Sequence, residues 1–240
     1  MKVIIAIICF ISIGYNALAQ QHIALGDDAS YAVIKDPDGY VNVRNNPGSK
    51  TRVIGKIYRY NIFNCEPNSS TWWKILQVYK NEKPDWFEGY INKSHIELLT
   101  KWQTIKSRNI YKDSCRIKVD SMTVTIKKAP FNPKKHKLSY KDHEGLTLID
   151  GKRFWGTDTD LPRVKITSLK INKNGELLII PNKAFNDLYE PNLRTLSVCT
   201  DSDNTHYILM VNSDGAGSYA IIWIIKNNKY YGRYIDTSND

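Results

Sequence analysis

The chain has 240 residues, of which 42% are hydrophobic and 11% aromatic, and it carries a formal charge of +10. This composition supports a real hydrophobic core and excludes a mostly disordered chain, a collagen and a coiled coil. A mean hydropathy of −0.44 excludes a polytopic membrane protein, and four cysteines are too few for a disulfide-dense miniprotein.

The first 19 residues have the pattern of a secretory signal peptide. Lys2 precedes an uncharged apolar run over 3–13, and Ala17-Leu18-Ala19 forms a small-residue cleavage site. The run is shorter than the roughly 20 apolar residues that a membrane-spanning helix needs. We therefore expect a leader over 1–19 that is removed, a linker over 20–30, and a mature protein that is periplasmic or secreted and keeps no membrane span.

Residues 31–99 contain short runs rich in Val, Ile, Tyr and Trp, separated by turn signals such as Asp36-Pro37-Asp38-Gly39. Together these runs predict a small closed barrel, because closure leaves no sheet edge exposed. One tight helical turn is expected over 94–98. The expected strands are 31–34, 40–44, 53–58, 60–65, 72–79 and 89–91.

Four short motifs in this region resemble those of bacterial SH3-like domains and follow in the same order. They are VNVRNNP at 41–47, VIGKI at 53–57, WWKI at 72–75 and GYI at 89–91, where the family has LNVRSGPS, VIGTL, WYKV and GWV. Tyr60 departs from the family, which usually has glycine there. The resemblance covers a little under a third of the chain. It implies an SH3-like barrel over 31–99 that binds cell-wall peptides or glycans, or tethers an exported protein.

Four aromatic residues are the candidate ligand contacts of such a barrel, because rigid rings offer contact area at low entropy cost. They are Tyr40, Trp72, Trp86 and Tyr90. Burial in the small core is an equally good interpretation of each ring. Trp86 fits the core least well, because it lies in a loop, 81–88, that is longer than usual for the family.

The second half of the chain predicts a larger antiparallel β domain over 121–240, after a polar stretch over 100–120 that is expected to be a linker or an edge element. Residues 181–188 have helical potential of about two turns. Residues 219–225 are apolar at every position, so we expect a central strand that is covered on both faces. No known family is recognised over 101–240. The final strands are expected at 195–199, 206–211, 218–225 and 230–235.

The basic excess of the chain belongs to this second half. Residues 20–100 hold 10 basic and 9 acidic residues, a net of +1, and residues 101–240 hold 23 and 15, a net of +8. The densest stretch runs from Lys127 to Lys141, and Pro130 and Pro133 within it predict an exposed basic loop. Such a loop could attract anionic polymers, or it could only keep the protein soluble. Nucleic acid is not an expected partner of an exported protein.

Three cysteines remain after the leader: Cys65, Cys115 and Cys199. Export would permit a disulfide between Cys115 and Cys199, but their spacing indicates nothing. We expect three buried, unpaired side chains. Cys199 could also pair with His206 as a nucleophile and its base, although Cys199 lies in a hydrophobic strand.

Two acidic patterns were candidates for chemistry. Asp201–Thr205 imitates the start of a calcium loop, but His206 and Asn212 stand where that loop needs glycine and glutamate. We therefore expect an Asx-rich hairpin turn. The second pattern is a possible pair of carboxylates for glycan cleavage, drawn from Asp158, Asp160 and Glu190.

The sequence therefore predicts an exported, non-enzymatic binding protein whose SH3-like module recognises or tethers to a cell-envelope component such as peptidoglycan or an envelope protein. No catalytic residue, metal site or cofactor is expected. Two alternatives remain: a cell-wall-acting hydrolase that uses the barrel as a targeting arm, and a secreted interaction or inhibitor protein. The sequence indicates neither the ligand nor the oligomeric state.

Overall fold

The computed structural model describes residues 30–80, 83–85, 88–99, 107–212 and 215–237. The expected leader at 1–19 and the side chain of Trp86 lie outside these residues. As expected, the described chain is mainly β and its sheets are antiparallel, while its helical segments are 3₁₀ turns of three residues. None of these turns could reach across a lipid bilayer.

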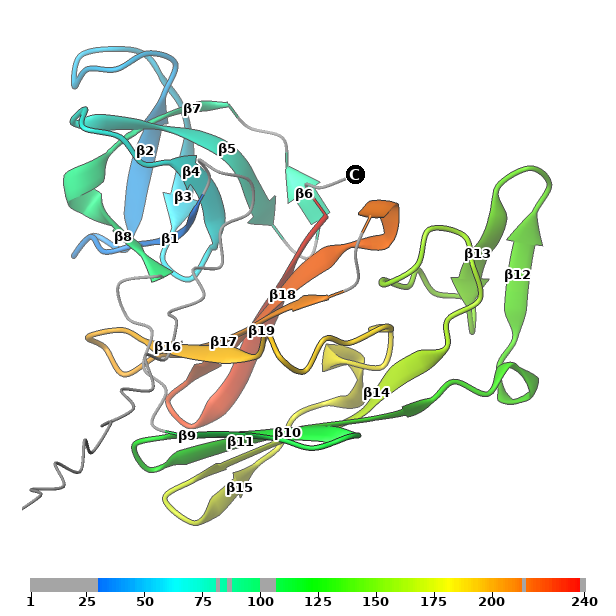
Figure 1. The fold of residues 1–240 in the computed structure, drawn as a ribbon. Helices are drawn as coiled ribbons and strands as arrows, with labels where there is room; N and C mark the ends of the chain where they lie inside the picture. Colours follow the sequence, from blue (N-terminus) through cyan, green and yellow to red (C-terminus); the bar gives the residue numbers. More distant parts are fainter. Residues whose placement is uncertain (1–29, 81–82, 86–87, 100–106, 213–214, 238–240) are drawn as a thin grey trace, which may run out of the picture.

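The N-terminal module is one eight-stranded sheet that curls around its own core (Figure 1). Its path of pairings ends at two strands that do not pair with each other within the described residues. The core contains Val43, Phe63, Cys65, Ile75 and Ile91, each fully buried. Along the sheet the strands are β3 (Val53–Tyr58), β2 (Tyr40–Arg44), β7 (Gly89–Asn92), β5 (Trp72–Lys80), β4 (Phe63–Glu66), β1 (Ser30–Ile34) and β8 (Ile96–Leu98), with β6 (Lys83–Asp85) attached to β5.

The expected strands of this module are found within a few residues of their predicted ranges, but the expected loop over 81–88 contains an additional strand, β6, which pairs with β5. The helical turn expected at 94–98 is shorter, a 3₁₀ turn η1 (Lys93–His95), and β8 follows it directly. Tyr60 has a φ of 72°, in the left-handed region that favours glycine. Its ring lies 5.1 Å from the ring of Tyr231, and the Lys226 ammonium lies 3.8 Å from its centre. These contacts with the second half of the chain offset the backbone cost that glycine would avoid.

The C-terminal half is built from two stacked antiparallel sheets. The first is five-stranded, and the second is a four-stranded meander, as expected from the tail. Two 3₁₀ turns, η4 (Asn182–Ala184) and η5 (Gly215–Gly217), lie in their connections. The order in the five-stranded sheet is β15 (Glu176–Leu178), β14 (Val164–Lys173), β11 (Met122–Pro130), β10 (Ser114–Val119) and β9 (Ser107–Ile110). The order in the meander is β16 (Ser197–Thr200), β17 (His206–Asn212), β18 (Tyr219–Lys226) and β19 (Lys229–Asp236).

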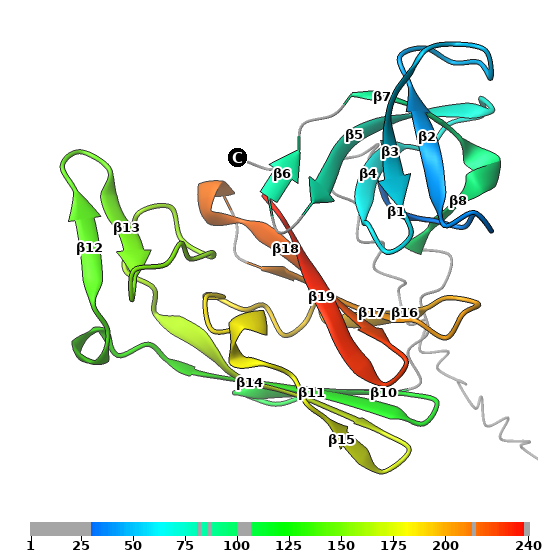
Figure 2. The same cartoon turned by 180° about the vertical axis from the view of Figure 1, so that it is seen from behind.

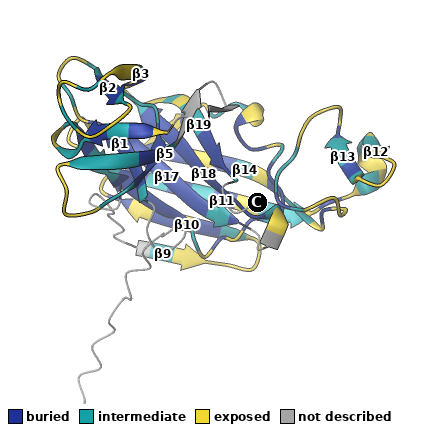
Figure 3. Cartoon of the chain, turned by 90° about the horizontal axis from the view of Figure 1, so that it is seen from above, coloured by how far each residue is buried: buried dark blue, intermediate teal, exposed yellow. Residues whose placement is uncertain are grey.

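Strand β18 is covered on both faces, which confirms the prediction from its apolar sequence. Ile221 and Trp223 pack into the core shared with the five-stranded sheet. The alternate residues Ile222 and Ile224 pack against Tyr31 and Ile62 of the N-terminal module. Figure 3 shows the resulting buried layer in dark blue across β17 and β18. The two halves of the molecule therefore share a hydrophobic core, and β18 lies between them.

Three expectations about the C-terminal half were wrong. Residues 107–119, expected within a linker, form β9 and β10, and Cys115, Ile117 and Val119 alternate inward along β10. The expected loop from Lys127 begins inside β11, continues through a 3₁₀ turn η3 (Pro133–Lys135) and enters a hairpin. That hairpin, β12 (Leu138–Lys141) with β13 (Gly145–Ile149), projects from the body (Figures 1 and 2).

The expected helix at 181–188 is reduced to the turn η4. The indole Nε1 of Trp223 donates a 2.7 Å hydrogen bond to the carbonyl of Ala184, which in a longer α-helix would accept from residue 188. Phe185 leaves the helical region at φ −152° and ψ −6°. Tertiary hydrogen bonding therefore ends the helix after its first turn.

Candidate functional site: an aromatic and charged groove in the N-terminal module

A groove of about 240 Å³ opens on the N-terminal module between the turn before β2, the strand β2 and the start of β5. Two of the four predicted ligand residues, Tyr40 and Trp72, line it together. They come from strands that are not neighbours in the sheet, because β7 lies between β2 and β5. The other lining residues used below are Asp36, Asp38, Arg44, Asn92 and His95.

The acidic side of the groove is a turn with a fixed shape. The Asp36 carbonyl accepts from the Gly39 N–H at 3.0 Å, and Gly39 has a φ of 77° that suits its lack of a side chain. One carboxylate oxygen of Asp36 accepts from the Asp38 N–H at 2.9 Å. The other contacts Nδ1 of His95, 59 residues later in the chain. The turn therefore holds one carboxylate against an imidazole at the edge of the groove.

Hydrogen bonding and charge hold the pKa of Asp36 below its usual value. The Asp38 N–H contributes most, followed among the favourable contacts by the imidazole of His95. A lowered pKa keeps a carboxyl ionised over a wider pH range. The groove consequently presents a negative charge at neutral pH on this side.

The aromatic wall is supported from outside the groove. The ring of Tyr40 lies 6.2 Å from that of Tyr58 on the neighbouring strand β3, and the ammonium of Lys56 lies 3.9 Å from its centre. These contacts restrict the ring without burying it. Trp72 is opposite Asn92 in the β5–β7 ladder, and the Asn92 side chain accepts from the Ser94 N–H at 3.0 Å. Both rings are half-exposed, as ligand contacts need to be, and the ring of Tyr40 is held by its neighbours.

Arg44 brings a positive charge to the groove from the end of β2. Its Nη1 donates to the carbonyl of Thr51. The Thr51 hydroxyl lies 2.7 Å from the carbonyl oxygens of both Asn46 and Gly48 and has one hydrogen to donate to either of them. Arg44 therefore satisfies a carbonyl of the loop between β2 and β3. The guanidinium has five donors, so donors remain for a ligand while the loop is held.

The other two predicted ligand residues are placed differently. Tyr90 is paired with Arg44 across β2 and β7, so both side chains lie on the same outward face, but Tyr90 does not line the groove. Trp86 lies outside the described residues. Sequence reasoning missed Asp36 and His95 as groove residues. The turn signal pointed to Asp36, but only the pairing of β1 with β8 brings His95 to it.

The three acidic residues considered for glycan cleavage do meet, in a different place. Asp158, Asp160 and Glu190 line a cleft of about 690 Å³ in the C-terminal half, together with Arg163. Glu190 is already engaged: one oxygen accepts the backbone N–H groups of Arg163 and Val164, and the other lies 3.7 Å from the Arg163 guanidinium. Glu190 therefore fixes the start of β14.

The remaining candidates for chemistry are accounted for structurally. Burial raises the pKa of Cys199 to about 12, so its thiol stays protonated. His206 instead contacts Thr200 and Lys173, at 2.9 and 2.8 Å. Asp201 accepts from the N–H groups of Asp203 and Thr205, which confirms the Asx turn. No cluster of three metal-ligating side chains occurs in the part of the chain that the structure describes.

Cys65, Cys115 and Cys199 are buried and unpaired, as expected. Comparison with known proteins adds no relative to this picture: no protein-family model, no curated protein and no solved structure matches the chain. The function is therefore argued from the residues themselves.

Proposed function

We propose that the protein is an exported, non-enzymatic binding protein and that its N-terminal module is an SH3-like domain with a ligand groove. The observation that carries the proposal is the convergence of Tyr40 and Trp72 on one groove with Asp36 and Arg44. Two half-exposed rings beside charges of both signs suit a ligand with apolar and charged parts. The order of the four SH3-like motifs supports the family assignment.

The chemistry of the groove favours a short peptide over a neutral glycan. The exposed carboxylate of Asp38, beside that of Asp36, can accept from an ammonium group, and the guanidinium of Arg44 can pair with a carboxylate. A cell-wall peptide carries both kinds of charge and small apolar side chains that fit against aromatic rings. We therefore place a peptide of the cell envelope in this groove.

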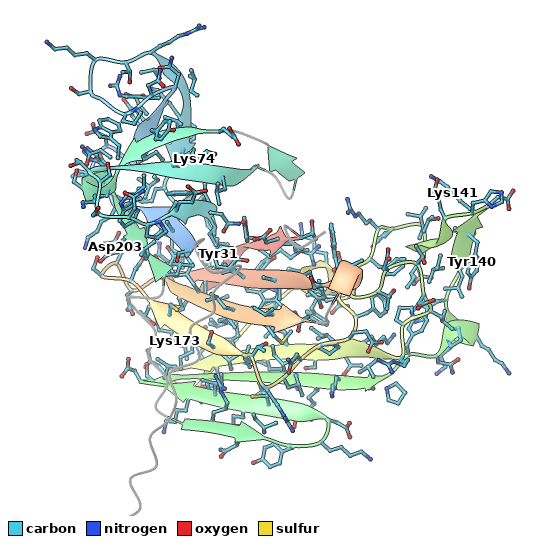
Figure 4. The ribbon with its side chains drawn as sticks, turned by 45° about the horizontal axis from the view of Figure 1, so that its top comes forward. Tyr31, Lys74, Tyr140, Lys141, Lys173 and Asp203 are labelled. Carbon is cyan, nitrogen blue, oxygen red and sulfur yellow. The ribbon has the colours of Figure 1, made fainter. Side chains whose placement is uncertain are left out.

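Co-sedimentation with purified peptidoglycan tests the proposal. The full chain should sediment with the sacculi, and Trp72→Ala should remain in the supernatant. Tyr140→Ala is the matched control, because Tyr140 is also an exposed aromatic residue but lies on the projecting hairpin (Figure 4). Equal sedimentation of the Trp72 and Tyr140 variants would contradict the assigned groove.

The same incubation separates the binding protein from the hydrolase. The shared cleft of Asp158 and Asp160 is the observation that favours the hydrolase. Soluble muropeptides released by the native chain, and lost in Asp158→Asn/Asp160→Asn, would establish hydrolysis and overturn the non-enzymatic part of the proposal. Intact sacculi after prolonged incubation support binding alone.

A further inference from the structure

The outer face of the five-stranded sheet presents exposed and half-exposed side chains along β10, β11 and β14. The inward residues of β10 and β11, such as Ile117 and Val124, belong to the main core. On each strand, the residues that alternate with these inward positions point away from the main core, as the alternating burial of β10 shows. In Figures 1 and 2 the sheet forms the side of the molecule opposite the N-terminal module.

Four cations are arranged on this face by the strand register. Arg116 on β10 is opposite Thr125, which is opposite Lys170 on β14. Lys118, two residues after Arg116 on β10, is opposite Thr123 on β11. Lys127, two residues after Thr125 on β11, is opposite Ser168 on β14. All four cations are exposed, and strand geometry separates neighbouring charges by about 7 Å along a strand and about 10 Å across two ladders.

No carboxylate balances these charges. Among the described residues, none of Arg116, Lys118, Lys127 and Lys170 forms an ion pair. The acidic residues nearest in sequence stand at strand ends: Asp113 precedes β10, Asp120 follows it, and Glu176 begins β15. Asp120 acts on the imidazole of His206 on the opposite, packed side. The face therefore carries a field of one sign.

The remaining outward side chains decide which polyanion fits. Between the cations stand hydroxyl and amide groups, those of Thr123, Thr125, Asn109 and Asn172. One apolar residue, Leu177, and one exposed aromatic residue, Tyr111, complete the outward set. Tyr111 directly follows β9, and its backbone N–H donates to the carbonyl of Ser114, which is opposite Lys127. Single-stranded nucleic acids are held by stacking of successive bases on several aromatic rings, whereas this face has a single ring at its edge. Hydroxyl and amide groups beside cations match a chain of sugars that carries carboxylates.

We infer that the outer face of the five-stranded sheet binds an anionic polysaccharide laid across β10, β11 and β14. The cations contact successive carboxylates, and the threonine and asparagine side chains hydrogen-bond to sugar hydroxyls. This surface lies on the opposite side of the C-terminal half from the peptide groove and does not depend on it. Binding is expected to weaken with salt, since exposed charge pairs are screened.

Fluorescence anisotropy of a labelled oligogalacturonate with the full chain tests this inference. The variant Arg116→Thr/Lys170→Thr removes two cations but keeps residues that suit a strand. It should bind about thirtyfold more weakly, given a gain of about 1 kcal/mol per cation near an anionic surface. The matched control, Lys134→Thr/Lys135→Thr, removes the same charge from the turn η3 and should bind as the native chain does. If the first variant fails to fold, Lys118→Gln/Lys127→Gln takes its place.

Three results would overturn the inference. The first is that oligogalacturonate does not bind at low ionic strength. The second is an equal loss of affinity in the sheet variant and in the control, which would show that only net charge matters. The third is tighter binding of a single-stranded DNA oligonucleotide with the same number of charges, which would assign the face to nucleic acid. The native chain should instead prefer the uronate at each salt concentration.

Discussion

The hydroxyl of Tyr31, on the first described strand, donates a 2.9 Å hydrogen bond to the carboxylate of Asp236, at the end of the last strand. The same oxygen accepts from the side-chain amide of Asn64 at 2.8 Å. Asp236 is only 1% exposed. A buried carboxylate of the C-terminal sheet is thus satisfied by two donors of the N-terminal module, and this couples the two halves beyond their shared apolar contacts. Figure 4 shows Tyr31 at this boundary.

Replacing Asp236 by alanine should destabilise the whole molecule. The change leaves the buried donors of Tyr31 and Asn64 without this acceptor, which costs about 2–4 kcal/mol in the free energy of unfolding. The control is Asp203→Ala, which removes an exposed pair with Arg59 at 3.4 Å and should cost less than about 1 kcal/mol. Urea unfolding followed by tryptophan fluorescence measures both. Equal midpoints would show that Asp236 does not couple the halves.

Acid should weaken the C-terminal half through His206. Burial, followed by the nearby Lys173 ammonium, lowers the pKa of this imidazole from 6.5 to about 4. The unfolded chain therefore binds a proton between these pH values that the folded chain excludes, and stability falls as the pH decreases from 6.5 toward 4. Between pH 7 and pH 5 the loss from this group is about 2 kcal/mol.

The replacement His206→Gln isolates this effect, because glutamine cannot take up the proton. Its free energy of unfolding should change less between pH 7 and pH 5 than that of the native chain, although it starts lower. The Lys173 ammonium has only donors, so it donates to Nε2 and the proton of the neutral ring sits on Nδ1, facing Thr200. Identical pH slopes in the two proteins would contradict the assignment.

The three buried cysteines should not react in the folded protein. Burial raises the pKa of Cys65 and Cys199 to about 12 and also raises that of Cys115. Since the thiolate is the reactive form, a thiol reagent at pH 8 should modify none of them until urea is added. The measurement uses the variant Cys9→Ser, so that Cys65, Cys115 and Cys199 are the three thiols of the protein. Rapid labelling under native conditions would show that one of them is accessible.

Tyr60 offers a test of how contacts offset backbone strain. Alanine at this position keeps the unfavourable φ and loses the contacts with Tyr231 and Lys226, whereas glycine loses the contacts but relieves the backbone. Tyr60→Ala should therefore be less stable than Tyr60→Gly by about 1 kcal/mol. Thermal unfolding of the two variants measures this difference, and Tyr60→Ala should have the lower melting temperature. The opposite order would mean that the left-handed turn is not kept in solution.

The sequence predicted the β class and the strands of the first half because turn signals and alternation are local. It predicted the two covered faces of β18 for the same reason. It did not predict β9 and β10, where cations alternate with Cys115 and Ile117 and make the stretch resemble a linker. Nor could it predict contacts between distant residues: the end of the helix at Ala184 depends on Trp223, and the acidic side of the groove depends on His95.

The most direct test of the central claim is amide chemical-shift mapping of the ¹⁵N-labelled protein with soluble, purified muropeptides. Binding in the proposed groove predicts the largest shifts at Tyr40, Trp72, Asn92 and His95, with the Trp72→Ala variant showing none of them. Shifts confined to Thr157, Asp158 and Asp160 in the C-terminal cleft, or no shifts at millimolar ligand, would contradict the account.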